Sequence, residues 1–159
     1  MGNWTRVNLK SDVEDSATKF GFAPDLEARF ASGDLALEKS AVSYQRLAPG
    51  FRLPFGHSHD QQEELYVVLS GGGRLKLDDE IVEVGPLDAV RIAPEVTRGF
   101  EAGADGVEIL AFGAPNTGGP ADDILVGNYL SNIFQKLHVS RRSQAAVYFS
   151  KRFPSKAKT

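Results

Sequence analysis

Short runs of alternating apolar and polar residues, separated by turn residues, fill the chain from about residue 28 to residue 114. In residues 74–77, for example, two leucines alternate with an arginine and a lysine. A period of two is typical of β-strands that bury one face, and glycine, proline and aspartate mark the turns between them. The predicted strands cover residues 28–30, 35–37, 42–47, 65–69, 74–77, 80–84, 88–93, 98–101 and 107–113. Since no helical periodicity interrupts them, the pattern predicts an all-β barrel or sandwich.

The segments on either side of this region have different patterns. Residues 1–27 are predicted to form an N-terminal arm with weak local signals, in which Trp4, Val7 and Leu9 could add an edge strand. Residues 115–130 begin with a stretch rich in glycine and proline and are predicted to be a linker. Residues 131–159 combine apolar positions at roughly helical spacing with a basic end. We therefore expect one barrel domain, residues 28–114, followed by a linker and a partly helical, basic tail.

Charge and composition restrict the setting and the partners of the protein. All 21 acidic residues precede residue 131, whereas residues 131–159 carry seven basic side chains and no acid. We expect this basic tail to stay near the acidic domain, and we do not expect nucleic-acid binding. The chain has no cysteine, no apolar run long enough to span a membrane and no visible secretory signal. A cytoplasmic protein without membrane contact is therefore expected.

Two of the three histidines in the chain, His57 and His59, stand one residue apart just before a predicted strand. On an extended backbone both imidazoles point to the same side. Glu64 follows five positions later and shares its strand face with Tyr66, whereas Glu63 faces the other way. Two imidazoles and one carboxylate from neighbouring strands are a ligand set for a divalent transition metal. The alternative is a pair of surface histidines beside a solvated acidic run.

The spacing His57-x-His59, four residues, Glu64, six residues, Gly71 resembles the first motif of the cupin superfamily. One departure is that Phe51 stands where the family has a glycine. The resemblance implies a double-stranded β-helix, or jelly-roll barrel, and a homodimer. It also implies that these three residues bind a metal inside the barrel, with zinc, manganese, iron or nickel as candidates.

The second cupin motif is matched here in length but not in its residues. Its histidine, the family's remaining metal ligand, is replaced by Arg98. A guanidinium stays protonated and cannot coordinate a metal. Either the three remaining ligands hold a cation with open positions, or Arg98 takes the metal's place and pairs with Glu64 in a metal-free pocket. A solvated Arg98 at the strand end is a further alternative, but we expect an inward side chain and weak metal binding.

The resemblance does not choose among several functions. The leading interpretation is a small cupin that binds a small polar or anionic ligand in its barrel, with or without a divalent metal. A metal-dependent enzyme of the dioxygenase or sugar isomerase and epimerase type is one alternative, and a non-enzymatic binding or regulatory module is another. If there is catalysis, Glu64, Tyr66 and Arg98 are the candidate residues, because the first two can transfer protons and the arginine can orient an anionic ligand.

Overall fold

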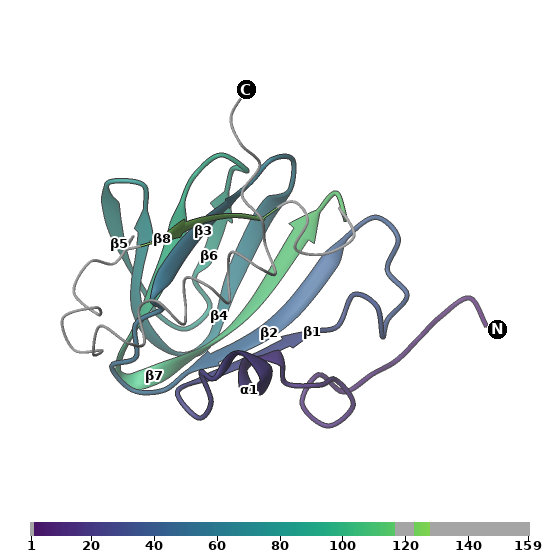
Figure 1. Cartoon of the computed structure of the whole chain (residues 1–159). Coiled ribbons are helices and arrows are strands. Elements are labelled where there is room, and N and C mark those ends of the chain that lie inside the picture. The colour runs from purple at the N-terminus through teal and green to yellow at the C-terminus, as the bar shows by residue number, and fades with distance from the viewer. Residues whose placement is uncertain (1, 117–122, 128–159) are drawn as a thin grey trace.

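The structure is a computed structural model that describes residues 2–116 and 123–127. In these residues the chain forms one short helix and eight strands, which are all antiparallel (Figure 1). The predicted all-β class is confirmed. The elements are α1 (Ser16–Phe20), β1 (Leu26–Phe30), β2 (Ala41–Leu47), β3 (Phe55–His59), β4 (Glu63–Leu77), β5 (Glu80–Val84), β6 (Ala89–Ile92), β7 (Arg98–Ala114) and β8 (Asp123–Gly127).

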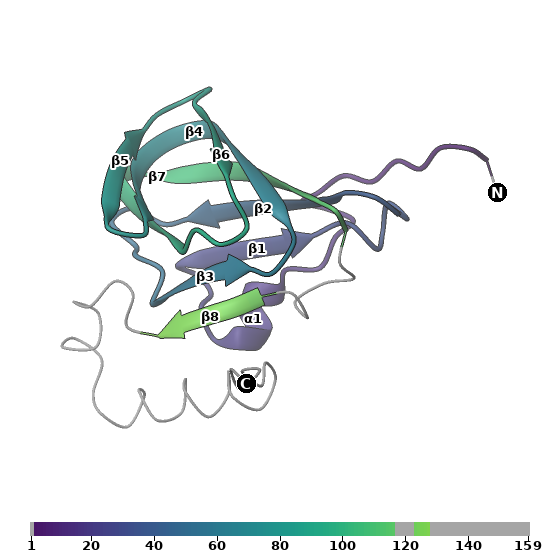
Figure 2. The same cartoon turned by 90° about the horizontal axis from the view of Figure 1, so that it is seen from above.

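The strands wrap into a double-stranded β-helix, in which two long strands connect the two layers. β1, β2, β7, β3 and β8 are neighbours in that order, and β4 pairs with β5, β6 and β7. Viewed from above, β4, β5 and β6 lie across the barrel from β1, β3 and β8 (Figure 2). β4 and β7 pair with each other along nearly their whole lengths, so this ladder is the longest strand pairing in the described part of the barrel.

The ladder between β4 and β7 bends back on itself in the region of its glycines. Glu64 pairs with Gly113 near one end of the ladder, and Leu77 pairs with Arg98 at the other. Both ends lie at the same side of the barrel, as the distance of 3.3 Å between the side chains of Glu64 and Arg98 shows. We call this side the site end and the bend the far end.

Glycines 71–73, predicted to end a strand, instead let β4 continue through the bend. The ladder shifts register between Val68 and Ser70 and again between Gly71 and Gly73. Gly71 has a φ of 67°, and a Cβ there would collide with the carbonyl oxygen of Gly106. Only glycine permits this close crossing of two backbones. For the same reason the two predicted strands 98–101 and 107–113 are one strand, β7, which passes through Gly106 at a φ of 74°.

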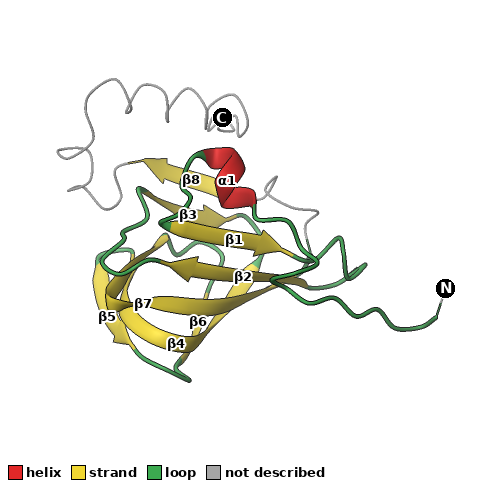
Figure 3. Ribbon diagram, turned by 90° about the horizontal axis from the view of Figure 1, so that it is seen from below, coloured by secondary structure: helices red, strands yellow, loops and turns green. Residues whose placement is uncertain are grey.

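Two strand predictions near the N-terminus are wrong. Residues 35–37 form a turn, because the amides of Leu35 and Leu37 donate to the carbonyls of Ala31 and Ser32 rather than to another strand. Trp4, Val7 and Leu9 lie in no strand, and Trp4 is exposed. The arm contains α1 instead, which lies against β1 (Figure 3).

Helix α1 depends on its N-cap residue, Asp15. The Oδ1 atom of Asp15 accepts hydrogen bonds from the amide of Ala17, at 3.0 Å, and from that of Ala28 in β1, at 2.9 Å. This one carboxylate therefore caps the helix and fixes it to the sheet.

The predicted linker 115–130 contains a strand, β8, which pairs with β3 from Phe55 to His59. Its sequence, DILVG, places three branched apolar residues together, which favours a strand that the linker prediction did not include. The predicted helix and tail, residues 131–159, lie outside the described residues. Among the described residues there is no helix long and apolar enough to cross a membrane.

Candidate metal centre

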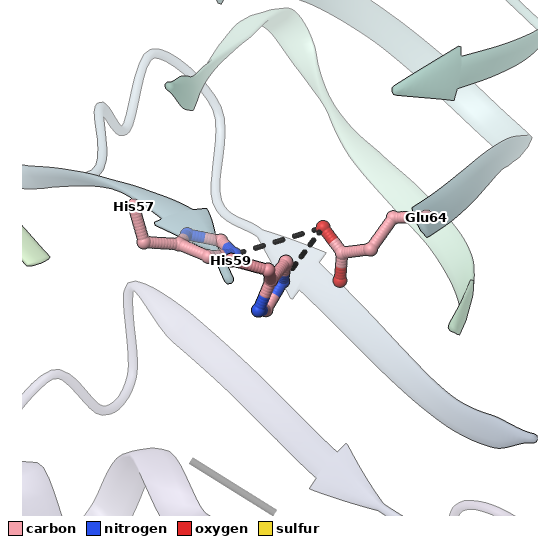
Figure 4. A group of neighbouring side chains, drawn as sticks. All are labelled: His57, His59 and Glu64. Carbon is pink, nitrogen blue, oxygen red and sulfur yellow. Dashed lines mark ion pairs between the residues drawn. The ribbon is translucent and has the colours of Figure 1, made fainter. Parts of the chain in front are cut away.

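His57 and His59, on β3, point to the same side of the strand and face Glu64 of β4 (Figure 4). The distance from His57 Nε2 to Glu64 Oε2 is 3.6 Å, and that from His59 Nε2 to the same oxygen is 3.4 Å. Potential ligand atoms from the three residues all lie within 4.8 Å of one another. The structure thus brings the three predicted ligands together. The alternative, surface histidines beside a solvated acidic run, does not hold, because His59 is buried and the side chain of Glu64 is only 12% exposed.

Strand parity decides which of the two adjacent glutamates enters the barrel. The side chain of Glu64 is 12% exposed, whereas that of Glu63 is 48% exposed and pairs with Arg91 on the outer surface. The predicted parity is confirmed, since Tyr66 follows Glu64 into the interior and Leu65 is exposed.

The local charges keep Glu64 ionised. Burial alone would raise the pKa of this carboxyl, but its interactions with His57 and His59 and the charge of Arg98 outweigh burial. The pKa of Glu64 is therefore held well below its usual range. At neutral pH the site offers one carboxylate between two imidazoles.

The three residues fit a divalent cation. The Oε2 atom of Glu64 is buried and accepts no hydrogen bond, although three nitrogen atoms lie within 3.6 Å of it. A buried carboxylate oxygen without a hydrogen bond costs free energy. Two ligands bound at about 2.1 Å to a tetrahedral zinc ion lie about 3.4 Å apart, close to the two nitrogen–oxygen separations found here. A cation between these atoms would satisfy the oxygen without moving the strands.

Arg98 points into the barrel beside this group. It pairs with His57 in the ladder between β3 and β7, its side chain is 1% exposed, and its Nε lies 3.3 Å from Glu64 Oε2. The solvated alternative is therefore wrong, and the expected contact with Glu64 is present. The contact joins a single pair of atoms, Nε of Arg98 and Oε2 of Glu64, and is therefore not bidentate.

The terminal nitrogens of Arg98 are engaged by backbone carbonyls. NH1 donates to His57 at 3.2 Å and to Pro94 at 3.5 Å, and NH2 donates to Ala93 at 3.1 Å. The Pro94 carbonyl also accepts the amide of His59 at 2.8 Å. Arg98 thus links β3 to the turn before β7. The sequence also suggested that Arg98 orients an anionic ligand. For that role Arg98 would have to give up its hydrogen bonds to these carbonyls and form new ones to the ligand.

Sequence analysis did not identify Gln62, which is buried against Gly113, the ladder partner of Glu64. Its Nε2 donates to the carbonyl of Pro115 at 2.8 Å, and its side chain covers the position where Gly113 has no Cβ. Gln62 reads in the sequence as part of a polar loop, so no pattern indicated it. Tyr66, a predicted candidate, is buried on the same face of β4 as Glu64 and packs in the core.

Comparisons with known proteins agree with this architecture. The cupin domain profile matches residues 43–112. A cupin protein from Bacteroides fragilis is 29% identical, with 74% of this chain and 89% of that chain covered and a TM-score of 0.60. Residues 43–112 are therefore a cupin domain. None of the curated proteins compared with the chain matches it.

Two further solved structures share the fold at lower identity. KdgF from Halomonas sp. is 16% identical, with 72% of this chain and 94% of that chain covered and a TM-score of 0.56. Pac13 from Streptomyces, a nucleoside dehydratase solved with uridine, is 18% identical, with 64% and 78% covered and a TM-score of 0.55. At this level of identity the likeness concerns the fold alone.

Proposed function

We propose that the protein binds a divalent metal ion through His57, His59 and Glu64 and that it takes up a small polar or anionic ligand inside the barrel. The observation that carries this proposal is the buried Oε2 atom of Glu64, which accepts no hydrogen bond although it lies 3.6 Å from Nε2 of His57 and 3.4 Å from Nε2 of His59. Two histidines and one carboxylate leave coordination positions open for a ligand.

Each residue has a defined part in this site. The two imidazoles would donate lone pairs from Nε2 to the cation, and Glu64 would supply the negative charge. Arg98 anchors the turn at Pro94 and brings one positive charge close to Glu64, so the apo site is close to neutral when both histidines are neutral. A bound cation would supply Lewis acidity that polarises an oxygen atom of the ligand.

The charge of Arg98 has a predictable effect on metal affinity. At an effective dielectric constant of about 20, two unit charges 4 Å apart interact by about 4 kcal/mol. A nearby guanidinium therefore opposes a divalent cation, and a three-ligand site with this neighbour should bind metal more weakly than one with a fourth ligand. We propose a labile metal centre on this basis.

The contact between Arg98 and Glu64 also favours a second candidate, a metal-free pocket. In that case the guanidinium at 3.3 Å balances the carboxylate by itself, and the histidines contact the ligand directly. The solved structure of Pac13 with uridine supports a small-molecule ligand as a class, and its low identity gives no reason to transfer uridine itself.

Metal titration of matched glutamate variants tests the proposal. The chain is stripped of metal with a chelator, and the affinity for Zn²⁺ and Mn²⁺ is measured by calorimetry for the wild type, Glu64→Gln and Glu63→Gln. Loss of a ligand should weaken binding by about 100-fold or more in Glu64→Gln, because even residues that only support ligands change affinity by about 10- to 100-fold. Glu63→Gln, on the outer face, should bind like the wild type.

Two results would contradict the metal centre. One is equal affinity in both variants, which would place the metal elsewhere. The other is a wild type that binds neither ion, which would favour the metal-free pocket.

A further inference from the structure

The barrel wall on β2 carries two polar residues where an apolar core is expected. The inward positions of this strand are Ala41, Ser43, Gln45 and Leu47, identified by their ladder partners on β7. Leu47 pairs with Val107 at the far end, and both are buried in the core. The polar inward residues, Ser43 and Gln45, therefore lie on the part of β2 that precedes the apolar far end.

The ladder register places Ser43 in one row with Tyr66. Ser43 pairs with Ala111 of β7, and Ala111 pairs with Tyr66 of β4, so the three side chains point to the same side of the sheet. Glu64 lies in the next row, where it pairs with Gly113. Adjacent strands are about 4.8 Å apart, so Ser43 and Tyr66 are separated by about 10 Å of backbone, with only the methyl group of Ala111 between them.

The two polar side chains of β2 contact each other. Gln45 Nε2 donates to Ser43 Oγ at 3.3 Å, and Ser43 is 6% exposed. A hydroxyl that accepts one hydrogen bond still has its own proton to donate, and the amide oxygen of Gln45 still has lone pairs to accept one. Ser43 is buried and Gln45 is half-buried, and withdrawing such groups from water costs free energy unless a further partner satisfies them. The Ser43–Gln45 pair, as we call these two side chains, thus offers one donor and one acceptor on the inner wall.

We infer that the Ser43–Gln45 pair is a specificity-determining contact that binds a hydroxyl group of the ligand. A hydroxyl both donates and accepts, which matches the acceptor of Gln45 and the donor of Ser43. This inference rests on the proposed function, because it places the other end of the ligand, an oxygen donor, at the metal centre. The ligand class is then a small hydroxylated acid with a carboxylate at one end and a hydroxyl several carbon atoms away.

Matched pairs of acids test the inference. The probes are gluconate and hexanoate, and the shorter pair threonate and butyrate, in which only the hydroxyl groups differ. Dissociation constants are measured by calorimetry on the zinc-loaded full chain of the wild type, Ser43→Ala, Gln45→Leu and Val42→Ala. Val42→Ala is the control, since Val42 lies on the same strand and faces outward.

The wild type and Val42→Ala should bind at least one hydroxylated acid about tenfold or more tightly than its matched partner. Ser43→Ala and Gln45→Leu should reduce this ratio to about threefold or less, while zinc affinity and melting temperature stay close to the wild type. Two different variants guard against a folding defect in one of them. A wild-type ratio near one in both pairs, or a ratio that neither variant changes, overturns the inference.

The experiment distinguishes an error in the proposed metal centre from an error in the role given to the Ser43–Gln45 pair. If the wild type binds no zinc, the proposed function fails, and the same acids are titrated into the metal-free chain. A preference for the hydroxylated acid that depends on Ser43 and Gln45 would then still support the pair. No such preference in the metal-free chain would overturn it.

Discussion

At the far end of the barrel, glycines bring the backbones of β4 and β7 close together, and the buried side chains there, such as Ala102 and Val107, are apolar. At the site end the same two strands carry Glu64, Tyr66 and Arg98 and contribute to a buried polar group. At the far end Gly71 and Gly73 approach the carbonyls of β7 so closely that a methyl group would collide. A single pair of strands thus supplies both the packed part of the fold and two sides of the candidate site.

The difference indicates how free energy is distributed along the barrel. The apolar part of the barrel, between the glycine bend and the site end, buries large side chains without polar atoms, such as Leu75 and Phe100, which pair directly in the ladder. The site end leaves Glu64 Oε2 without a hydrogen bond. We therefore expect substitutions in the apolar part to lower stability, and substitutions at the site end to change mainly what is bound.

The largest expected effect is on stability. Phe100→Ala should lower the free energy of unfolding by about 3–5 kcal/mol, because it removes a fully buried aromatic ring and leaves a cavity. Denaturant unfolding of the metal-free protein measures this. Phe112→Ala is the matched control, since Phe112 lies on the same strand but is 39% exposed, and its loss should cost about 1 kcal/mol. Equal losses in the two variants would show that the core does not lie where the register places it.

The next effect sharpens the role of Arg98. Arg98→His should raise zinc affinity by about tenfold or more, because it removes a positive charge and places an imidazole where the family has a ligand. Arg98→Met removes the charge without adding a ligand and should give a smaller gain. Calorimetric titration compares the two variants with the wild type. Unchanged affinity in both would mean that the guanidinium does not influence the cation.

The smallest expected effect concerns acid stability. The pKa of Glu64 is lower in the folded than in the unfolded state, so the unfolded state binds more protons as the pH falls below about 5. The contribution of Glu64 to stability is therefore present near neutral pH and is lost as the pH falls through its folded-state pKa. In Glu64→Gln the acid-induced loss of unfolding free energy should be smaller than in the wild type, by about 1 kcal/mol. A pH profile identical to that of the metal-free wild type would contradict this assignment.

The sequence predicted the grouping of His57, His59 and Glu64 better than it predicted where strands begin and end. Spacing and strand parity were enough to bring His57, His59 and Glu64 together and to turn Glu63 outward, because alternation is a local property of an extended backbone. The inward Arg98 followed from the register of the second motif. Its bonds to backbone carbonyls did not, since these depend on how the turn at Pro94 packs against β3.

The errors have a common cause in tertiary structure. Glycines 71–73 look like a strand end, but here they permit a bend against a second strand that is distant in sequence. Strand β8 was hidden in a linker because its partner, β3, lies more than sixty residues earlier. The glycine bend leaves no local signal, and the three branched apolar residues of β8 are too short a signal to stand out beside a stretch rich in glycine and proline.

The most direct test of the central claim is X-ray absorption at the zinc edge of the loaded full-length protein. We predict two imidazole nitrogens and oxygen ligands at about 2.0–2.2 Å, with the imidazole scattering reduced by half in His59→Ala. A zinc coordination shell without imidazole nitrogen, or imidazole scattering that His59→Ala leaves unchanged, would show that the metal is not held by His57, His59 and Glu64.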